Sequence, residues 1–277
     1  MQYLVFLTAM TLVSGVSGGF QGTPSPAATA STPAKPQGTP ATGRDYFLFT
    51  RALRPLQQGQ VTTQVTMDVA GEGLHVTVRG DIVLTHKSSG EFVSEMTVQP
   101  PMGGKPRRYK VINNDTRTWV QDLSAKTYAI QKVGEDNEFL VRGLLVGLAK
   151  TALAKLKPEQ LKLMDAPEPT PELLAALEAG TKDDEGTLKV RDETREGKTY
   201  RVYDLQPEKN KEGVISLFVG TASYPERLTM TLTQDKLKIN FTEAIKSVLP
   251  AIPAGTSFRY TPTRGIKKVK KIDLGSF

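Results

Sequence analysis

The sequence predicts an α+β fold, a curved antiparallel half-barrel of about ten strands covered by inserted helices. Apolar and polar residues alternate in short runs along most of the chain, and turns containing Gly or Ser separate the runs. Such alternation is typical of strands with one apolar face, and short turns favour antiparallel neighbours. A leucine-rich stretch broken by prolines interrupts the runs near the middle of the chain. Because a large sheet with one apolar face must close, stack or be covered, this stretch is expected to supply the cover.

The helices are predicted from apolar side chains that recur every three or four positions. Residues 44–57 show this spacing, with Asp45 in the first turn. The middle stretch predicts helices over 138–156, 159–164 and 171–179, the last with Thr170 as its cap and Pro171 at its first position. The strand runs are 61–69, 74–84, 92–98, 109–111, 119–123 and 128–130 before these helices, and 188–190, 200–202, 215–219, 228–232 and 237–241 after them.

The chain begins with an apparent export segment. Residues 1–18 combine a short apolar run with small residues at Val16 and Gly18, which predicts a cleaved signal peptide. No Lys or Arg precedes the run, so a retained anchor is the alternative. Residues 19–43 are rich in Pro, Ala and Thr and are predicted to be a disordered linker. The folded domain is then 44–277, and the expected location is the periplasm or the extracytoplasmic face of the cell envelope.

The composition argues against most enzyme classes. The chain has no cysteine, which excludes disulfides, a thiolate nucleophile and zinc sites of the cysteine type. Its two histidines, His75 and His86, are predicted to be surface residues. The sequence contains no nucleophile elbow, zinc-protease helix, P-loop or dinucleotide-binding fingerprint. We therefore expect a non-enzymatic protein without catalytic residues, metal or cofactor, and a hydrolase with two paired carboxylates is the third possibility.

Several segments of the chain have a distinctive order. They are Gly90–Met96, Asn114–Leu123 with its Trp-Val pair, Thr199–Leu205, Tyr224–Leu228, Ile239–Phe241 and Ile252–Tyr260. In this order they resemble the outer-membrane lipoprotein carriers, the lipoprotein-sorting (LolA/LolB-like) family. The resemblance covers roughly Asp45 to Pro262, as an order of elements more than as identities, with Gln121 and Leu123 standing where the family usually has Tyr and Pro.

This resemblance implies a half-barrel that holds acyl chains of lipids or lipoproteins under a helical lid. The protein would then be a carrier or sorting factor. Two alternatives stay open: an envelope sensor or adaptor that binds a protein partner through the same fold, and a barrel whose leucines fill it as an ordinary core. Strand parity and helix face give the residues expected to line a ligand cavity: Val65, Met67, Val76, Val78, Met96, Trp119, Leu144, Leu148, Leu217 and Met230.

The C-terminal region carries the most unusual charge pattern in the chain, which has 36 basic and 29 acidic residues. Basic residues alternate there with β-branched ones, and no aromatic residues are interleaved, so nucleic acid is not an expected partner. The pattern favours an edge strand protected by lysines, and a contact with an anionic membrane surface is the alternative. The cations concerned are Arg264, Lys267, Lys268, Lys270 and Lys271.

Overall fold

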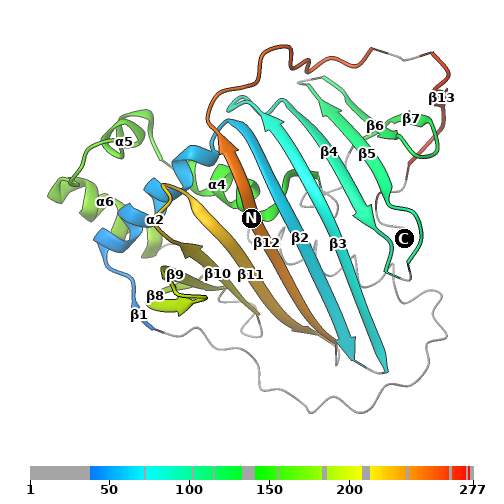
Figure 1. Ribbon diagram of the computed structural model, residues 1–277. Coiled ribbons are helices and arrows are strands. Elements are labelled where there is room, and N and C mark those ends of the chain that lie inside the picture. The colour runs from blue at the N-terminus through cyan, green and yellow to red at the C-terminus, as the bar shows by residue number, and fades with distance from the viewer. Residues whose placement is uncertain are drawn as a thin grey trace.

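The fold was analysed in a computed structural model of the chain (Figure 1). The structure describes residues 38–71, 73–101, 103–114, 116–132, 141–154, 156–182, 186–207, 213–234, 237–261, 264–272 and 274. The predicted signal peptide and nearly all of the predicted linker lie outside these residues. Its last residues are placed: Thr39 and Pro40 pair with a strand, and a helix begins at Gly43.

Strands of the described residues form one curved, unclosed sheet, which confirms the predicted fold class (Figure 1). Every neighbouring pair is antiparallel except β7 and β13, which are parallel. The spatial order of the strands is β1-β8-β9-β10-β11-β12-β2-β3-β4-β5-β6-β7-β13. Strand β2, near the start of the domain, therefore pairs with β12, near its end, in the middle of the sheet. The bounds are β1 Thr39–Pro40, β2 Gly59–Gly71, β3 Leu74–His86, β4 Phe92–Gln99, β5 Arg107–Asn113, β6 Thr118–Asp122, β7 Thr127–Ile130, β8 Gly186–Arg195, β9 Lys198–Pro207, β10 Gly213–Val219, β11 Pro225–Gln234, β12 Leu237–Leu249 and β13 Lys267–Lys268.

The helices lie where the sequence predicts them. Helix α2 spans Gly43–Leu53 and continues into a 3₁₀ turn, η1, at Arg54–Leu56. The middle stretch forms α4 (Leu144–Ala154), α5 (Pro158–Leu163) and α6 (Pro171–Lys182). The start of the predicted helix 138–156 lies outside the described residues. None of the helices within the described ranges has both the length and the apolar character that a membrane span requires.

One face of the sheet, here called the inner face, carries the main apolar core. Strand register places Val65, Val78 and Met230 on this face, and its buried side chains form one continuous cluster with those of η1 and α4. Helices α2 and α4 lie over the β9–β12 half of the sheet, where they pack against each other and α4 contacts β11. A smaller cluster joins Phe47 of α2 to Leu173 and Leu177 of α6, so α6 packs on the far side of α2.

The opposite, outer face is covered in part by the chain that follows β12. Phe258 packs there against Val93 of β4 and Ile112 of β5. Trp119 of β6 belongs to this same cluster, and its ring lies 6.1 Å from that of Tyr260. The segment leaves β12, runs along the edge of the sheet and reaches β13 beside β7 (Figure 1). Where Val93, Ile112 and Trp119 lie side by side, β4 to β6 are therefore apolar on both faces.

A buried carboxylate anchors helix α4 to the sheet. Glu243 of β12 is fully buried, and its Oε2 accepts a hydrogen bond of 3.0 Å from the Leu145 N–H in the first turn of α4. Gly143, just before the helix, has a φ of +74°, and a Cβ there would collide with this carboxylate. Burial raises the pKa of Glu243 to about 7, because the hydrogen bonds from the N–H groups of Leu145 and Leu144 offset the loss of hydration only in part.

This contact predicts a specific pH dependence of stability. The folded-state pKa of Glu243 lies above its ordinary value of 4.5, so its stabilising contribution is complete below pH 4.5 and is lost as the pH rises through about 7. The substitution Glu243→Gln keeps an acceptor for the Leu145 N–H and removes the titration. We expect the variant to exceed the parent in free energy of unfolding by on the order of 3 kcal/mol at pH 8, and by little at pH 4.

Urea unfolding of parent and variant at both pH values measures this difference. Comparing the two proteins cancels the titration of other groups, among them buried His86. A difference that is the same at pH 4 and pH 8 would contradict the assignment of the raised pKa to Glu243.

Candidate functional site

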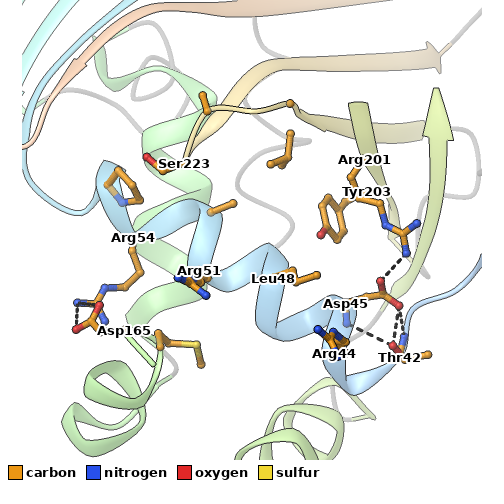
Figure 2. A pocket seen from close by; sticks show the side chains of 16 residues that line it. Thr42, Arg44, Asp45, Leu48, Arg51, Arg54, Asp165, Arg201, Tyr203 and Ser223 are labelled. Carbon is orange, nitrogen blue, oxygen red and sulfur yellow. Dashed lines mark hydrogen bonds and ion pairs between the residues drawn. The ribbon is translucent and has the colours of Figure 1, made fainter. Parts of the chain in front are cut away.

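An open groove of about 890 Å³ lies between α2 and the end of the sheet formed by β9, β10 and the turn to β11 (Figure 2). Strand register puts Tyr203 and Val219 on the inner face, so the groove is the part of that face that the helices leave uncovered. The residues that line it are Thr42, Arg44, Asp45, Leu48, Arg51, Ala52, Arg54, Pro55, Met164, Asp165, Arg201, Tyr203, Val219, Gly220, Ala222 and Ser223.

Helix α2 is held against the sheet by a capping box that also forms an ion pair. The Thr42 hydroxyl accepts a hydrogen bond from the Asp45 N–H, and the Asp45 carboxylate accepts one of 2.9 Å from the Thr42 N–H. Asp45 also pairs with Arg201 of β9 at 2.8 Å. Burial alone would raise the pKa of Asp45, but the hydrogen bonds from Thr42 and Arg201 outweigh it and hold the pKa below its ordinary value. One carboxylate thus fixes both the start of α2 and its place over β9.

The floor of the groove is apolar. Leu48 of α2 and Tyr203 of β9 lie on either side of it in Figure 2. Leu48 is 40% exposed although it belongs to a helix that is otherwise well packed. Tyr203 is buried and packs against Phe49 with ring centroids 5.3 Å apart, and burial raises the pKa of its hydroxyl to about 12. An apolar ligand laid in the groove would therefore cover Leu48.

Arginines form the rim of the groove. Arg44 pairs with Glu168 and Arg54 with Asp165, each at 3.3 Å. Arg51 donates to the backbone oxygens of Ala166 and Pro167. The rim thus ties α2 to the segment after α5 and borders an apolar floor with arginines, of which Arg44 and Arg54 are paired with carboxylates and Arg51 with backbone oxygens. A ligand with an acyl body and an anionic or polar head has matching chemistry.

The polar groups of the groove do not form a catalytic arrangement. Its two carboxylates, Asp45 and Asp165, are each paired with an arginine. Within the described residues, no group of three His, Asp or Glu side chains is placed to hold a metal ion. The arrangement is suited to binding.

The predicted cavity residues lie in the core, outside the groove. Val65, Val78 and Met96 border a residual space of about 30 Å³ beside Leu274, enough for a water molecule and too small for a ligand. Leu148 is half-buried against the same core. The other inner-face residues of the prediction are buried in it: Met67, Val76, Leu144, Leu217 and Met230.

Two predicted placements differ from the structure. Trp119 lies on the outer face, in register with Ile112, while its neighbour Val120 faces inward. Alternation cannot assign the faces of β6 because both residues are apolar. His86, predicted at the surface, is 7% exposed, and burial together with the charges of Arg142 and Lys150 lowers its pKa to about 4.

The groove itself was missed by the sequence interpretation, which searched for alternating apolar positions. One wall of the groove is helix α2, where Leu48 lies outside the apolar stripe of the predicted helix. The other wall is the end of β9 and β10, with Arg201, which is far from α2 in sequence. The detectable signals were Leu48 as an extra apolar residue in 44–57 and Arg201 at an inner-face position of its strand. Neither signal reveals a groove without the packing of α2 on β9.

The fold and groove together define a non-closed half-barrel with a helical cover. No protein-family model matches the chain, and no curated protein matches it. Solved structures that are similar include LprF from Mycobacterium bovis, with 11% identity, a TM-score of 0.38, and coverage of 80% of this chain and 99% of that one.

Two further solved structures show similarly low sequence identity and TM-scores. A LolA superfamily protein from Nitrosomonas europaea has 9% identity and a TM-score of 0.28 over 76% of this chain and 96% of that one. MucB in the MucA/MucB complex of Pseudomonas aeruginosa has 15% identity and a TM-score of 0.33 over 78% of this chain and 60% of that one.

The anchoring of α2 makes a prediction about stability. Replacing Asp45 by Ala removes the carboxylate that accepts from the Thr42 N–H and leaves Arg201 paired only with Asp192, while the N–H of residue 45 keeps its bond to the Thr42 hydroxyl. We expect a loss of about 1 kcal/mol or more in the free energy of unfolding at pH 7, measured by urea titration, because hydrogen bonds to a charged group contribute roughly 1.5 to 3 kcal/mol. The loss should shrink as the pH falls below 3.8, because protonation removes the contribution of a carboxylate with a depressed pKa.

Asp165→Ala is the matched control. It removes an ion pair of the same groove, but its carboxylate is 68% exposed and caps no helix, so its expected effect is about 0.5 kcal/mol or less. Equal losses for the two variants would contradict the role given to Asp45.

Proposed function

We propose that the chain is a non-enzymatic protein of the cell envelope that binds acyl chains of a lipid or lipoprotein, as a carrier or sorting factor. The observation that carries this proposal is the groove on the inner face, which has an apolar floor beside Leu48 and a border of arginines. We assign the acyl chain to the floor and the polar head of the ligand to the border.

The size and chemistry of the groove support this assignment. Its volume of about 890 Å³ lies in the usual range of small-molecule sites, roughly 300 to 1,000 Å³. An acyl chain gains about 0.8 kcal/mol for each CH₂ group it buries, so ten buried CH₂ groups supply on the order of 8 kcal/mol before the entropic cost of binding. No reacting group is needed for such binding.

A second candidate function is supported by the filled interior of the half-barrel. Beyond the groove, the inner face is covered by α4 and by the C-terminal residues, with only about 30 Å³ left beside Leu274. A domain with a filled barrel and an open, arginine-bordered groove can also bind an acidic, apolar protein segment as an envelope adaptor. The two functions differ in whether the purified chain takes up lipid.

Uptake of a fluorescent fatty acid tests the proposal. Leu48→Asp places a charge on the groove floor, and we expect it to weaken binding of a dansyl-labelled fatty acid at least about tenfold, because burying an unpaired carboxylate beside an acyl chain is costly. Fluorescence titration gives the affinity, and native mass spectrometry gives the stoichiometry.

Leu249→Asp is the control, because it makes the same substitution at a 49% exposed leucine of β12 that does not line the groove. Its affinity should equal that of the parent. Equal affinities for all three proteins would remove the groove as the acyl site, and a parent that takes up no fatty acid would favour the adaptor.

We also propose that the C-terminal cations contact an anionic membrane surface. Lys267 and Lys268 form the edge strand β13 beside β7, as the favoured interpretation of this segment expects. Within the described residues none of the five cations of this segment has a carboxylate within ion-pair distance, and all five are exposed. They are Arg264, Lys267, Lys268, Lys270 and Lys271.

Vesicle co-sedimentation tests this contact. Changing the four lysines to Gln should reduce binding to vesicles with 30% phosphatidylglycerol by roughly a hundredfold at low salt, because each basic residue near such a surface contributes about 1 kcal/mol and part of it is screened. Binding to neutral phosphatidylcholine vesicles should be weak for both proteins. Unchanged binding to the anionic vesicles would contradict the proposed contact.

A further inference from the structure

The C-terminal segment passes from the outer face to the inner face around the free edge of the sheet. Phe258 packs on the outer face, β13 lies along β7, and Ile272 and Leu274 are buried in the main core of the inner face. The termini of most domains lie at the surface, and a buried terminal segment has to be held there by specific contacts.

Backbone hydrogen bonds and one side chain hold the segment. The N–H of Lys267 donates to the oxygen of Lys126 at 3.0 Å, and that of Val269 donates to the oxygen of Tyr128 at 2.8 Å. Beyond β7, the side-chain amide of Gln131 makes the two hydrogen bonds to the backbone of the segment that a neighbouring strand would otherwise make. Its Nε2 donates to the oxygen of Ile272, and its Oε1 accepts from the N–H of the same residue, both at 2.8 Å.

The sheet provides room for the apolar side chains of this segment. Leu274 lies beside Val65, Val78 and Met96, three of the residues that the sequence predicted for a ligand cavity. Gly80 stands on the inner face in the same place, and a Cβ there would lie only 3.0 Å from the Thr97 oxygen and 3.4 Å from Val65. The missing side chain leaves a depression over β3 and β4 that borders the same space as Leu274.

The segment itself is divided between a charged and an apolar side. Lys270 and Lys271 are exposed, while Val269 and Ile272 contact the core and Leu274 is 4% exposed. On the inner face the segment is held by the side chain of Gln131 and by the aliphatic side chains of Val269, Ile272 and Leu274. An acyl chain offers that face the same aliphatic contacts.

We propose that the C-terminal segment 264–274 is a built-in competitor for acyl chains, with Ile272 and Leu274 occupying the β3–β5 part of the inner face until a lipid replaces them. The ligand class is a linear acyl chain, and the inference rests on the proposed function. In this arrangement the apparent affinity for a ligand that needs the covered face equals the intrinsic affinity multiplied by the fraction of molecules in which the segment is undocked.

Two truncated chains test the inference. One ends at Lys271 and keeps every cation of the segment, and the other ends at Leu274 and serves as the matched control, so the pair differs only in residues 272–274. Titration with a dansyl-labelled fatty acid should give the chain ending at Lys271 an affinity between about ten- and a hundredfold above that of the full chain, or a second bound equivalent. The chain ending at Leu274 should match the full chain.

A peptide provides an independent measurement. A synthetic peptide with the sequence of residues 270–274 should displace part of the probe from the chain ending at Lys271, and it should have no effect on the full chain. If the shorter truncation does not unfold cooperatively, the full-length variants Gln131→Ala and Leu274→Asp carry the test, because each weakens docking and leaves the strands intact. Both should then bind the probe more tightly than the parent.

The outcomes separate this inference from the proposed function. Equal affinities for the two truncations, or for parent and full-length variants, overturn the competitor role. If Leu48→Asp still weakens binding of the probe when the competitor role is overturned, the proposed function stands without that role. If no protein takes up the probe, both fail together.

Discussion

An unclosed sheet of this size exposes one long apolar face, and covering that face is the constraint on which the rest of the structure depends. Two covers meet the need. Helices α2 and α4 lie over the half formed by β9 to β12, and the C-terminal residues lie over the half formed by β3 to β7. Neither cover is a strand of the sheet itself, so each is held by a few specific contacts. The groove is the area between the first cover and the sheet end that stays open.

The contacts that hold the helical cover are polar groups set in apolar surroundings. Glu243 lies in a register row with Leu228 on one side and Val65 on the other, and there it binds the first turn of α4. Asp45 does the equivalent for α2 through its pairing with Arg201. A buried carboxylate is a costly way to fasten a helix, and an apolar side chain of similar volume would stabilise the packing more. What such a contact adds is a defined position for the helix. At Glu243 it also makes the folded state less stable as the pH rises, because ionisation places a desolvated charge in the core.

The sequence predicts the fold well because its strands follow strict alternation and its helices have caps. Pro171 and Thr170 mark the start of α6 correctly, and the inner-face positions such as Met67 and Met230 follow from parity alone. Parity fails where a second apolar layer covers the other face, as at Trp119, whose partners on the outer face come from residues far away along the chain. For a related reason, the groove cannot be predicted from the sequence. It exists because α2 packs on β9, and that packing is fixed by the pairing of Asp45 with Arg201, which are separated by 156 positions.

Apart from Trp119, the residues predicted to line a cavity lie in the main core, where the chain itself covers them. Leu274 and α4 fill the half-barrel with aliphatic side chains of the same chemistry as an acyl chain. Under the proposed competitor role, the ligand cavity and the filled core that the sequence leaves open are two occupancies of one surface. Replacing one occupant by the other changes the free energy of apolar burial little, because each buried CH₂ group contributes about 0.8 kcal/mol whether it belongs to a leucine or to a lipid. The balance is then set by the contacts that an acyl chain cannot replace, among them the two hydrogen bonds of Gln131 with Ile272.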